Sequence, residues 1–215
     1  ILVCVLFGLD GLLGAVGKAA LRLGRPILGL RVEVSGLDRI RPGTPCVYMA
    51  NHESFLDGPI LFAFIPGLVR VILKKEVFRI PVVGPGMRSV GFVPVDRKGA
   101  RGGPQSIERA ARLMAGGGYS YLVFPEGTRS RDGRLQPFRR GGFFLALAGG
   151  APIVPVTIQG TFALMPRGRF SVRPGLVRVE FHAPVAVEGH TVQAMARLMD
   201  GIRGVIASAL GEVAQ

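Results

Sequence analysis

Short apolar runs alternate with segments of helical periodicity along most of this chain. The apolar runs predict strands at residues 46–50, 69–73, 91–95, 119–124, 153–158 and 177–181. Helical spacing predicts helices over residues 54–65, 105–115, 141–148 and 192–210. Strands that alternate with helices favour an α/β fold, with a mainly parallel central sheet flanked by helices.

The first thirty residues follow a different pattern. Residues 1–17 are apolar apart from Asp10, which divides them into pieces too short to cross ~30 Å of hydrocarbon as one helix of ~20 residues. Lys18, Arg22 and Arg25 then fall on one helical stripe. This pattern predicts an amphipathic, membrane-interfacial helical segment whose cations face anionic head groups; a helix packed on the domain's own core is the alternative. The predicted domains are thus an anchor at 1–30 and one α/β domain at 31–215.

Charge and hydropathy narrow the class of partner. The chain has 27 Lys and Arg against 14 Asp and Glu, a net charge of +13, which favours an anionic partner such as nucleic acid, phospholipid head groups or a phosphorylated substrate. A mean hydropathy of +0.39 is high for a soluble nucleic-acid binder, and Trp is absent. A membrane surface fits both observations. Two cysteines without CxxC spacing support neither a disulfide framework nor a zinc site.

The first candidate chemistry is the run Asn51-His52-Glu53-Ser54-Phe55-Leu56-Asp57, between a predicted strand and a predicted helix. Open α/β sheets usually bind ligands at the C-terminal ends of their strands. With His52 in the turn and Asp57 in the first helical turn, the carboxylate can fold back to an imidazole nitrogen. The other nitrogen is then free to accept a hydroxyl proton. The alternative is structural, because Ser54 and Asp57 also match a capping box, with Ser54 as the N-cap.

A second motif, Phe124-Pro125-Glu126-Gly127-Thr128-Arg129-Ser130, follows the strand predicted at 119–124. Gly127 permits close backbone approach, and Arg129 offers a planar fork that matches phosphate oxygens. The alternative is a solvated basic loop in which Glu126 pairs with a neighbouring arginine. Together the two motifs supply what acyl transfer to a phosphate-bearing alcohol needs.

Five segments occur in a fixed order along the chain. They are Asn51-His52-x4-Asp57, Lys74-Lys75-Glu76-Val77-Phe78 with Pro81 and Gly84, Gly91-Phe92-Val93-Pro94-Val95-Asp96-Arg97, Phe124 to Ser130, and Ala151-Pro152-Ile153-Val154-Pro155-Val156. Together they resemble the glycerolipid acyltransferase family, most closely bacterial 1-acyl-glycerol-3-phosphate acyltransferases (lysophosphatidic acid acyltransferases). The resemblance implies a membrane-associated enzyme of phospholipid biosynthesis, which moves a fatty acyl group from coenzyme A or acyl carrier protein to the hydroxyl of lysophosphatidic acid and yields phosphatidic acid.

The same resemblance assigns residues to roles. It implies that His52 is the general base, that Asp57 orients it, and that the acceptor is bound by Glu126, Gly127, Thr128 and Arg129, with Arg129 on the phosphate. The resemblance also implies that Lys74 or Lys75 and Arg97 complete a phosphate clamp. No metal and no cofactor is expected, since the acyl donor is a substrate, and His182 and His190 lack the spacing of metal ligands.

The implied partners are a lysophospholipid acceptor, acyl-CoA or acyl carrier protein, and an anionic membrane surface, without nucleic acid. The implied location is the cytoplasmic face of the inner membrane, as a peripheral or monotopic protein. Four alternatives stay open: another lysolipid acceptor, a non-catalytic anionic-lipid-binding protein, a nucleic-acid-binding module, and a hydrolase with Ser54 as nucleophile. No Gly-x-Ser-x-Gly elbow supports the hydrolase.

Overall fold

The computed structural model describes residues 10–81, 83–89, 92–95, 102–169, 171–189 and 194–211. Within them the strands are β1 (Leu30–Ser35), β2 (Val47–Ala50), β3 (Val69–Lys74), β4 (Val93–Val95), β5 (Ser120–Val123), β6 (Ile153–Gln159) and β7 (Gly175–Phe181). They form a seven-stranded sheet in the order β1-β7-β6-β2-β5-β3-β4. Only the β6–β7 pair within this sheet is antiparallel. The predicted α/β fold with a mainly parallel sheet is confirmed.

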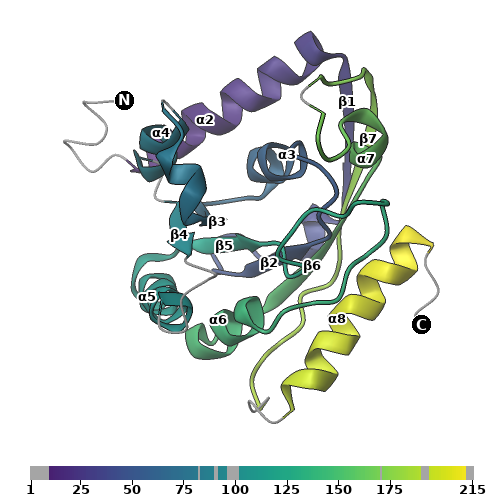
Figure 1. Ribbon diagram of the computed structural model, residues 1–215. Helices are drawn as coiled ribbons and strands as arrows, with labels where there is room; N and C mark the ends of the chain where they lie inside the picture. Colours follow the sequence, from purple (N-terminus) through teal and green to yellow (C-terminus); the bar gives the residue numbers. More distant parts are fainter. Residues whose placement is uncertain are drawn as a thin grey trace.

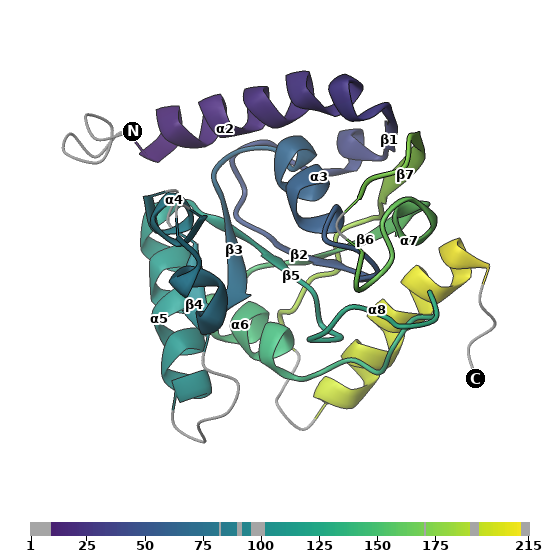
Figure 2. The ribbon, with the colours of Figure 1, turned by 45° about the horizontal axis from the view of Figure 1, so that its top comes forward.

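Helices cover both faces of this sheet (Figures 1 and 2). Their bounds are α2 (Asp10–Gly24), α3 (Asp57–Phe64), α4 (Val83–Ser89), α5 (Gly102–Gly117), α6 (Gly141–Gly149), α7 (Thr161–Leu164) and α8 (Met195–Leu210). Short 3-10 helices are η1 (Arg25–Leu28), η2 (Leu37–Arg39) and η3 (Lys75–Arg79).

Two hydrophobic cores lie on opposite faces of the sheet, because successive side chains of a strand point to opposite sides. Tyr48 and Ala50 of β2 join the core beneath α3 and α7, whereas Val47 and Met49 join the core that α5, α6 and α8 cover. The central strands are buried along their whole length: β2 and β5 have no exposed position. This burial on both faces explains why these strands are continuous apolar runs in the sequence.

The structure adds elements that the sequence analysis did not predict. These are the strand β1, the helices α4 and α7, and the 3-10 helices. β1 is an edge strand in which buried or half-buried Leu30, Val32 and Val34 alternate with exposed residues. Its alternation was a usable signal, whereas the four-residue α7 is too short to produce a helical period.

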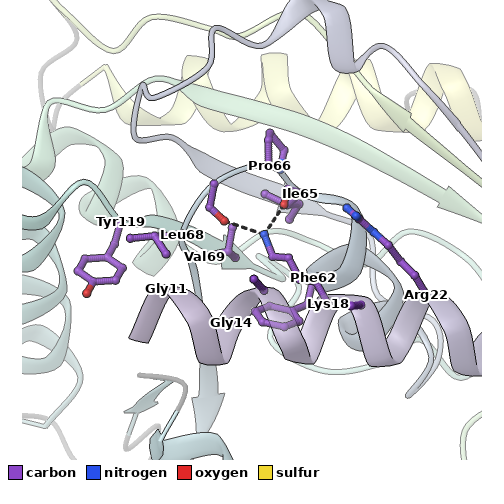
Figure 3. Close-up of a pocket in the computed structure, with 13 residues that line it drawn as sticks. Gly11, Gly14, Lys18, Arg22, Phe62, Ile65, Pro66, Leu68, Val69 and Tyr119 are labelled. Carbon is purple, nitrogen blue, oxygen red and sulfur yellow. Dashed lines mark hydrogen bonds between the residues drawn. The ribbon is translucent and has the colours of Figure 1, made fainter. Parts of the chain in front are cut away.

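Helix α2 lies across α3, on the outer side of that layer (Figure 2). Lys18 donates hydrogen bonds to the carbonyls of Ile65 and Gly67, at 2.6 and 2.7 Å (Figure 3). Arg22 Nε donates to the carbonyl of Ala63 at 2.8 Å. These carbonyls belong to the C-terminal end of α3 and the residues after it, where helical acceptors lack partners and a cation is favoured by the helix dipole.

The predicted orientation of α2 is therefore wrong: its basic stripe faces the protein instead of head groups. Lys18 packs against Phe62, while Arg22 and Arg25 stack on Phe64. The exposed side of α2 and of the following η1 is apolar instead, with Leu12, Val16, Leu23, Ile27 and Leu28 each about half exposed or more. Among the described residues, none of the helices has the length and apolar character needed to cross a bilayer.

Candidate active site

His52 and Asp57 lie where the C-terminal end of β2 turns into α3. Asp57 is the first residue of α3 and is completely buried, whereas 21% of the His52 side chain is exposed. The imidazole Nδ1 lies 2.8 Å from the carboxylate Oδ2. The contact that the sequence spacing predicted is therefore present.

The Asp57 carboxylate is held by backbone as well. Its Oδ2 accepts the N–H groups of Glu53 and Ser54, at 2.7 and 2.8 Å. Hydrogen bonds of this kind fix the position of the carboxylate. An imidazole that donates Nδ1–H to Asp57 keeps its lone pair on Nε2, so that Nε2 can accept a proton.

Three further contacts hold the His52 ring and its backbone. The ring stacks on Phe124, with centroids 4.0 Å apart and planes inclined by 19°. The backbone N–H of His52 donates to Glu126 at 2.7 Å, and its carbonyl accepts the N–H of Ser130 at 2.8 Å. The two motifs, which are about seventy residues apart in sequence, are thus joined directly, because β2 and β5 are parallel neighbours.

Ser54 does not serve as the predicted N-cap. Residue Leu56 takes the N-cap position of α3, without a side-chain hydrogen bond. The Ser54 hydroxyl instead donates to the carbonyl of Met165 at 2.7 Å and accepts the N–H of Leu56, and the residue is fully buried. Because its hydroxyl is inaccessible and committed to a carbonyl, Ser54 is poorly placed to be a nucleophile.

Glu126 is held by backbone N–H groups. Its side chain is buried, and its second carboxylate oxygen accepts the N–H of Gln136 at 3.0 Å. Burial raises the pKa of Glu126 to about 8; the two backbone donors oppose this rise, and the charges of Glu53 and Asp57 add to it. Backbone groups thus bond both of its oxygens, and the acceptor-binding role stays a prediction for this residue.

Gly127 is required by its conformation and by its surroundings. Its φ is +74°, and a Cβ at this position would lie 2.9 Å from the Arg139 side chain. Both observations exclude a larger residue without rearrangement. Thr128, the next residue, is exposed at the tip of the turn.

Arg129 extends from this turn onto Phe55. Its guanidinium carbon lies 3.7 Å from the ring centroid, a cation–π contact on a half-exposed phenylalanine. The Nη1 nitrogen is buried and has no hydrogen-bond partner. A fixed cation with an unused donor, at the same end of the sheet as His52, is suited to an anionic group of a ligand.

The remaining predicted residues are less fully defined. Lys74 ends β3 and Lys75 begins η3, at the same edge of the parallel sheet as His52. Arg97 lies outside the described residues, as do Cys4 and His190. His182 directly follows β7, which is separated from β2 by β6, and its Nε2 lies 2.8 Å from the Thr157 hydroxyl.

Sequence reasoning missed several residues that build the site. Phe55 and Phe124 supply the aromatic surfaces under Arg129 and His52. Asn51 bridges β2 and β6 through two hydrogen bonds with the backbone of Ile158. Phe55 and Asn51 lie inside the quoted motif, so their presence was visible there, but their contacts depend on the fold.

A cavity of about 280 Å³ lies at the other end of the parallel strands, between α2 and the start of β3. Gly11, Gly14, Lys18, Phe62 and Tyr119 are among the residues that line it (Figure 3). It opens near the N-terminal ends of β3 and β5, whereas His52 follows the C-terminal end of β2. This cavity is therefore separate from the candidate active site.

The fold and the site together define an α/β protein with a histidine–carboxylate pair and an adjacent arginine at the C-terminal edge of its sheet. The chain belongs to the Acyltransferase family, whose model matches residues 31–159. The family membership that the motifs suggested is thereby confirmed.

Individual proteins that are similar to this chain are named as 1-acyl-sn-glycerol-3-phosphate acyltransferases. The chain is 40% identical to the chloroplastic 1-acyl-sn-glycerol-3-phosphate acyltransferase of Brassica napus over 157 residues, which are 72% of this chain and 45% of that protein. It is 31% identical to the human alpha form of 1-acyl-sn-glycerol-3-phosphate acyltransferase, over 87% of this chain and 66% of that protein.

A solved structure is also similar, the crystal structure of the 1-acyl-sn-glycerophosphate acyltransferase PlsC from Thermotoga maritima. The TM-score is 0.77 at 27% identity, and the match covers 91% of this chain and 77% of that one. The chain spans about half the length of the plant relatives it matches, from 44% to 58%.

Proposed function

We propose that this protein transfers a fatty acyl group from a thioester donor to the free hydroxyl of lysophosphatidic acid, giving phosphatidic acid. The observation that carries the proposal is the 2.8 Å contact between His52 and the buried Asp57, beside an arginine with an unused donor. The names of the similar proteins support this choice of acceptor.

In the proposed mechanism, His52 Nε2 removes the proton of the acceptor hydroxyl as its oxygen attacks the thioester carbon. The tetrahedral intermediate then collapses and expels the thiolate, which needs no strong acid because the pKa of a thiol is low. Asp57 stabilises the imidazolium that forms, and Arg129 holds the acceptor phosphate. No side chain becomes acylated, and neither a metal nor a cofactor takes part.

The proposed donor is acyl-CoA or acyl carrier protein, and the proposed setting is phospholipid synthesis at an anionic membrane surface. The exposed apolar side of α2 and η1 supports membrane contact, since a row of large apolar side chains in water favours insertion among lipid chains. For a bacterial cell the proposed location is the cytoplasmic face of the inner membrane, as a peripheral or monotopic protein; two plant relatives are named as chloroplastic.

A direct assay tests the proposal. Purified protein on vesicles is mixed with radiolabelled long-chain acyl-CoA and, in parallel, with lysophosphatidic acid, lysophosphatidylcholine, lysophosphatidylglycerol, monoacylglycerol or no acceptor, and the products are separated by thin-layer chromatography. We expect labelled phosphatidic acid. Label in another phospholipid would indicate a different lysolipid acceptor, and free fatty acid alone would indicate a hydrolase.

If no product forms with acyl-CoA, the same panel is repeated with acyl carrier protein as the donor. A folded protein that is inactive with both donors and all acceptors, yet binds the vesicles, would be a non-catalytic lipid-binding protein. Acyl label that remains on the protein after denaturation, with no acceptor present, would contradict direct transfer.

A further inference from the structure

The loop after α7 runs against the two turns of the candidate active site. The Met165 carbonyl accepts the Ser54 hydroxyl at 2.7 Å, which ties this loop to the turn that holds His52. Two residues later, Arg167 Nη1 donates to the carbonyl of Arg129 at 3.4 Å. A single short segment, distant from both motifs in sequence, therefore contacts both.

This contact places two arginines side by side. The Arg129 guanidinium lies on Phe55 with a buried, unpartnered Nη1, and the Arg167 side chain is exposed next to it. Within the part of the chain that the structure describes, no carboxylate forms an ion pair with either arginine.

The two adjacent cations repel each other. Burial, and after it the charge of Arg167, lowers the pKa of Arg129, while Asp57 acts in the opposite direction. A bound anion would remove this repulsion and would use the donors that are left over. The geometry thus suits an anion that carries more than one charge.

We propose that Arg167 is a second phosphate-binding residue, which together with Arg129 selects acceptors that carry a phosphate monoester. This inference rests on the proposed function and adds a determinant of head-group specificity. A phosphate monoester has a charge near −2 at neutral pH, because its second pKa is about 6, and two planar guanidinium forks match that charge. The phosphodiester of a lysophosphatidylglycerol carries only one negative charge.

The test compares Arg167→Ala with Arg169→Ala, a matched control in the same loop whose side chain is also exposed. With lysophosphatidic acid, we expect Arg167→Ala to raise the acceptor KM about tenfold, equivalent to about 1.4 kcal/mol. We expect the donor KM and kcat to change little and Arg167→Lys to restore part of the loss. With lysophosphatidylglycerol, the rise should be clearly smaller, and Arg169→Ala should behave as wild type with both acceptors.

A second measurement does not depend on turnover. Binding of octyl phosphate, measured by calorimetry, should be about tenfold weaker in Arg167→Ala than in wild type and unchanged in Arg169→Ala. An unaltered KM and an unaltered octyl phosphate affinity in Arg167→Ala would overturn the inference, as would equal KM rises with both acceptors. If the wild-type protein does not acylate lysophosphatidic acid, the proposed function fails, and the octyl phosphate comparison alone decides whether Arg167 belongs to a phosphate site.

Discussion

The His52 turn (residues 51–57) and helix α2 both direct charged side chains into the protein, but over very different separations in sequence. Asp57 contacts His52 across five residues, whereas Lys18 and Arg22 reach carbonyls 41 to 49 residues away. The contacts of a charged side chain can therefore be predicted from the sequence pattern only where its partner lies within the same motif. In α2 the pattern does not reveal the partners of the basic side chains, because the carbonyls that they contact belong to another element.

This difference has a functional consequence. In the His52 turn, the Asp57 carboxylate contacts the imidazole Nδ1 and leaves the other imidazole nitrogen available. In α2, the cations are used to bind the end of α3, and apolar side chains are left facing outward. We propose that the first region is organised for chemistry and the second for contact with lipid.

The largest expected effect comes from removing the base. His52→Ala should lower the acyl-transfer rate by ~10²–10⁴-fold, because a positioned base contributes about that much. Asp57→Asn should also lower it strongly, since Asn is neutral and no longer stabilises the imidazolium. Rates would be measured with labelled donor on vesicles, and circular dichroism would check that each variant is folded. Wild-type turnover in folded His52→Ala would contradict the assignment.

The next effect concerns the cation beside the turn. Arg129→Ala should raise the acceptor KM by about 10- to 100-fold, since a hydrogen bond to a charged group contributes about 1.5–3 kcal/mol. The donor KM should change little, and Arg129→Lys should recover part of the loss because it keeps the charge but not the planar fork. Arg131→Ala, an exposed neighbour, is the matched control. A rise confined to the donor KM would place Arg129 at the nucleotide end instead.

A smaller effect tests the outward face of α2. Leu23 is 75% exposed on this face, and burying such a side chain is favourable by about 1.5–3 kcal/mol. Leu23→Glu should therefore weaken co-sedimentation with vesicles containing acidic lipid by about tenfold. Val205→Glu, on α8 at the opposite face of the sheet, should leave it unchanged (Figure 1). Equal losses in both variants would argue against α2 as the contact surface.

The last effect is the pH dependence of the inward cation, which acts on stability instead of activity or binding. Burial, with help from Arg22, lowers the pKa of Lys18 to about 8. Between about pH 8 and the ordinary lysine pKa of 10.5, the folded protein binds fewer protons here than the unfolded chain, so this residue makes the free energy of unfolding rise with pH. Lys18→Met should abolish that increment in denaturant titrations at pH 7.5 and 10. The same slope in wild type and Lys18→Met would show that Lys18 titrates normally.

The sequence by itself determined the parts of this protein that depend on nearby residues. Continuous apolar runs marked the central strands, since these are buried on both faces. The spacing of His52 and Asp57 across a strand-to-helix turn was enough to predict their contact, because few conformations of so short a segment are possible. The positive φ of Gly127 likewise agrees with a turn predicted from its motif.

Only the tertiary structure decided which distant groups meet. Whether the basic stripe of α2 faces inward depends on the unpaired carbonyls after α3, and the stacking of Arg129 on Phe55 depends on β2 lying beside β5. The approach of Arg167 to Arg129 depends on the path of the chain after β6. These contacts join segments 38 to 74 residues apart, and nothing local encodes them, because the free energy that selects them comes from burying whole elements together.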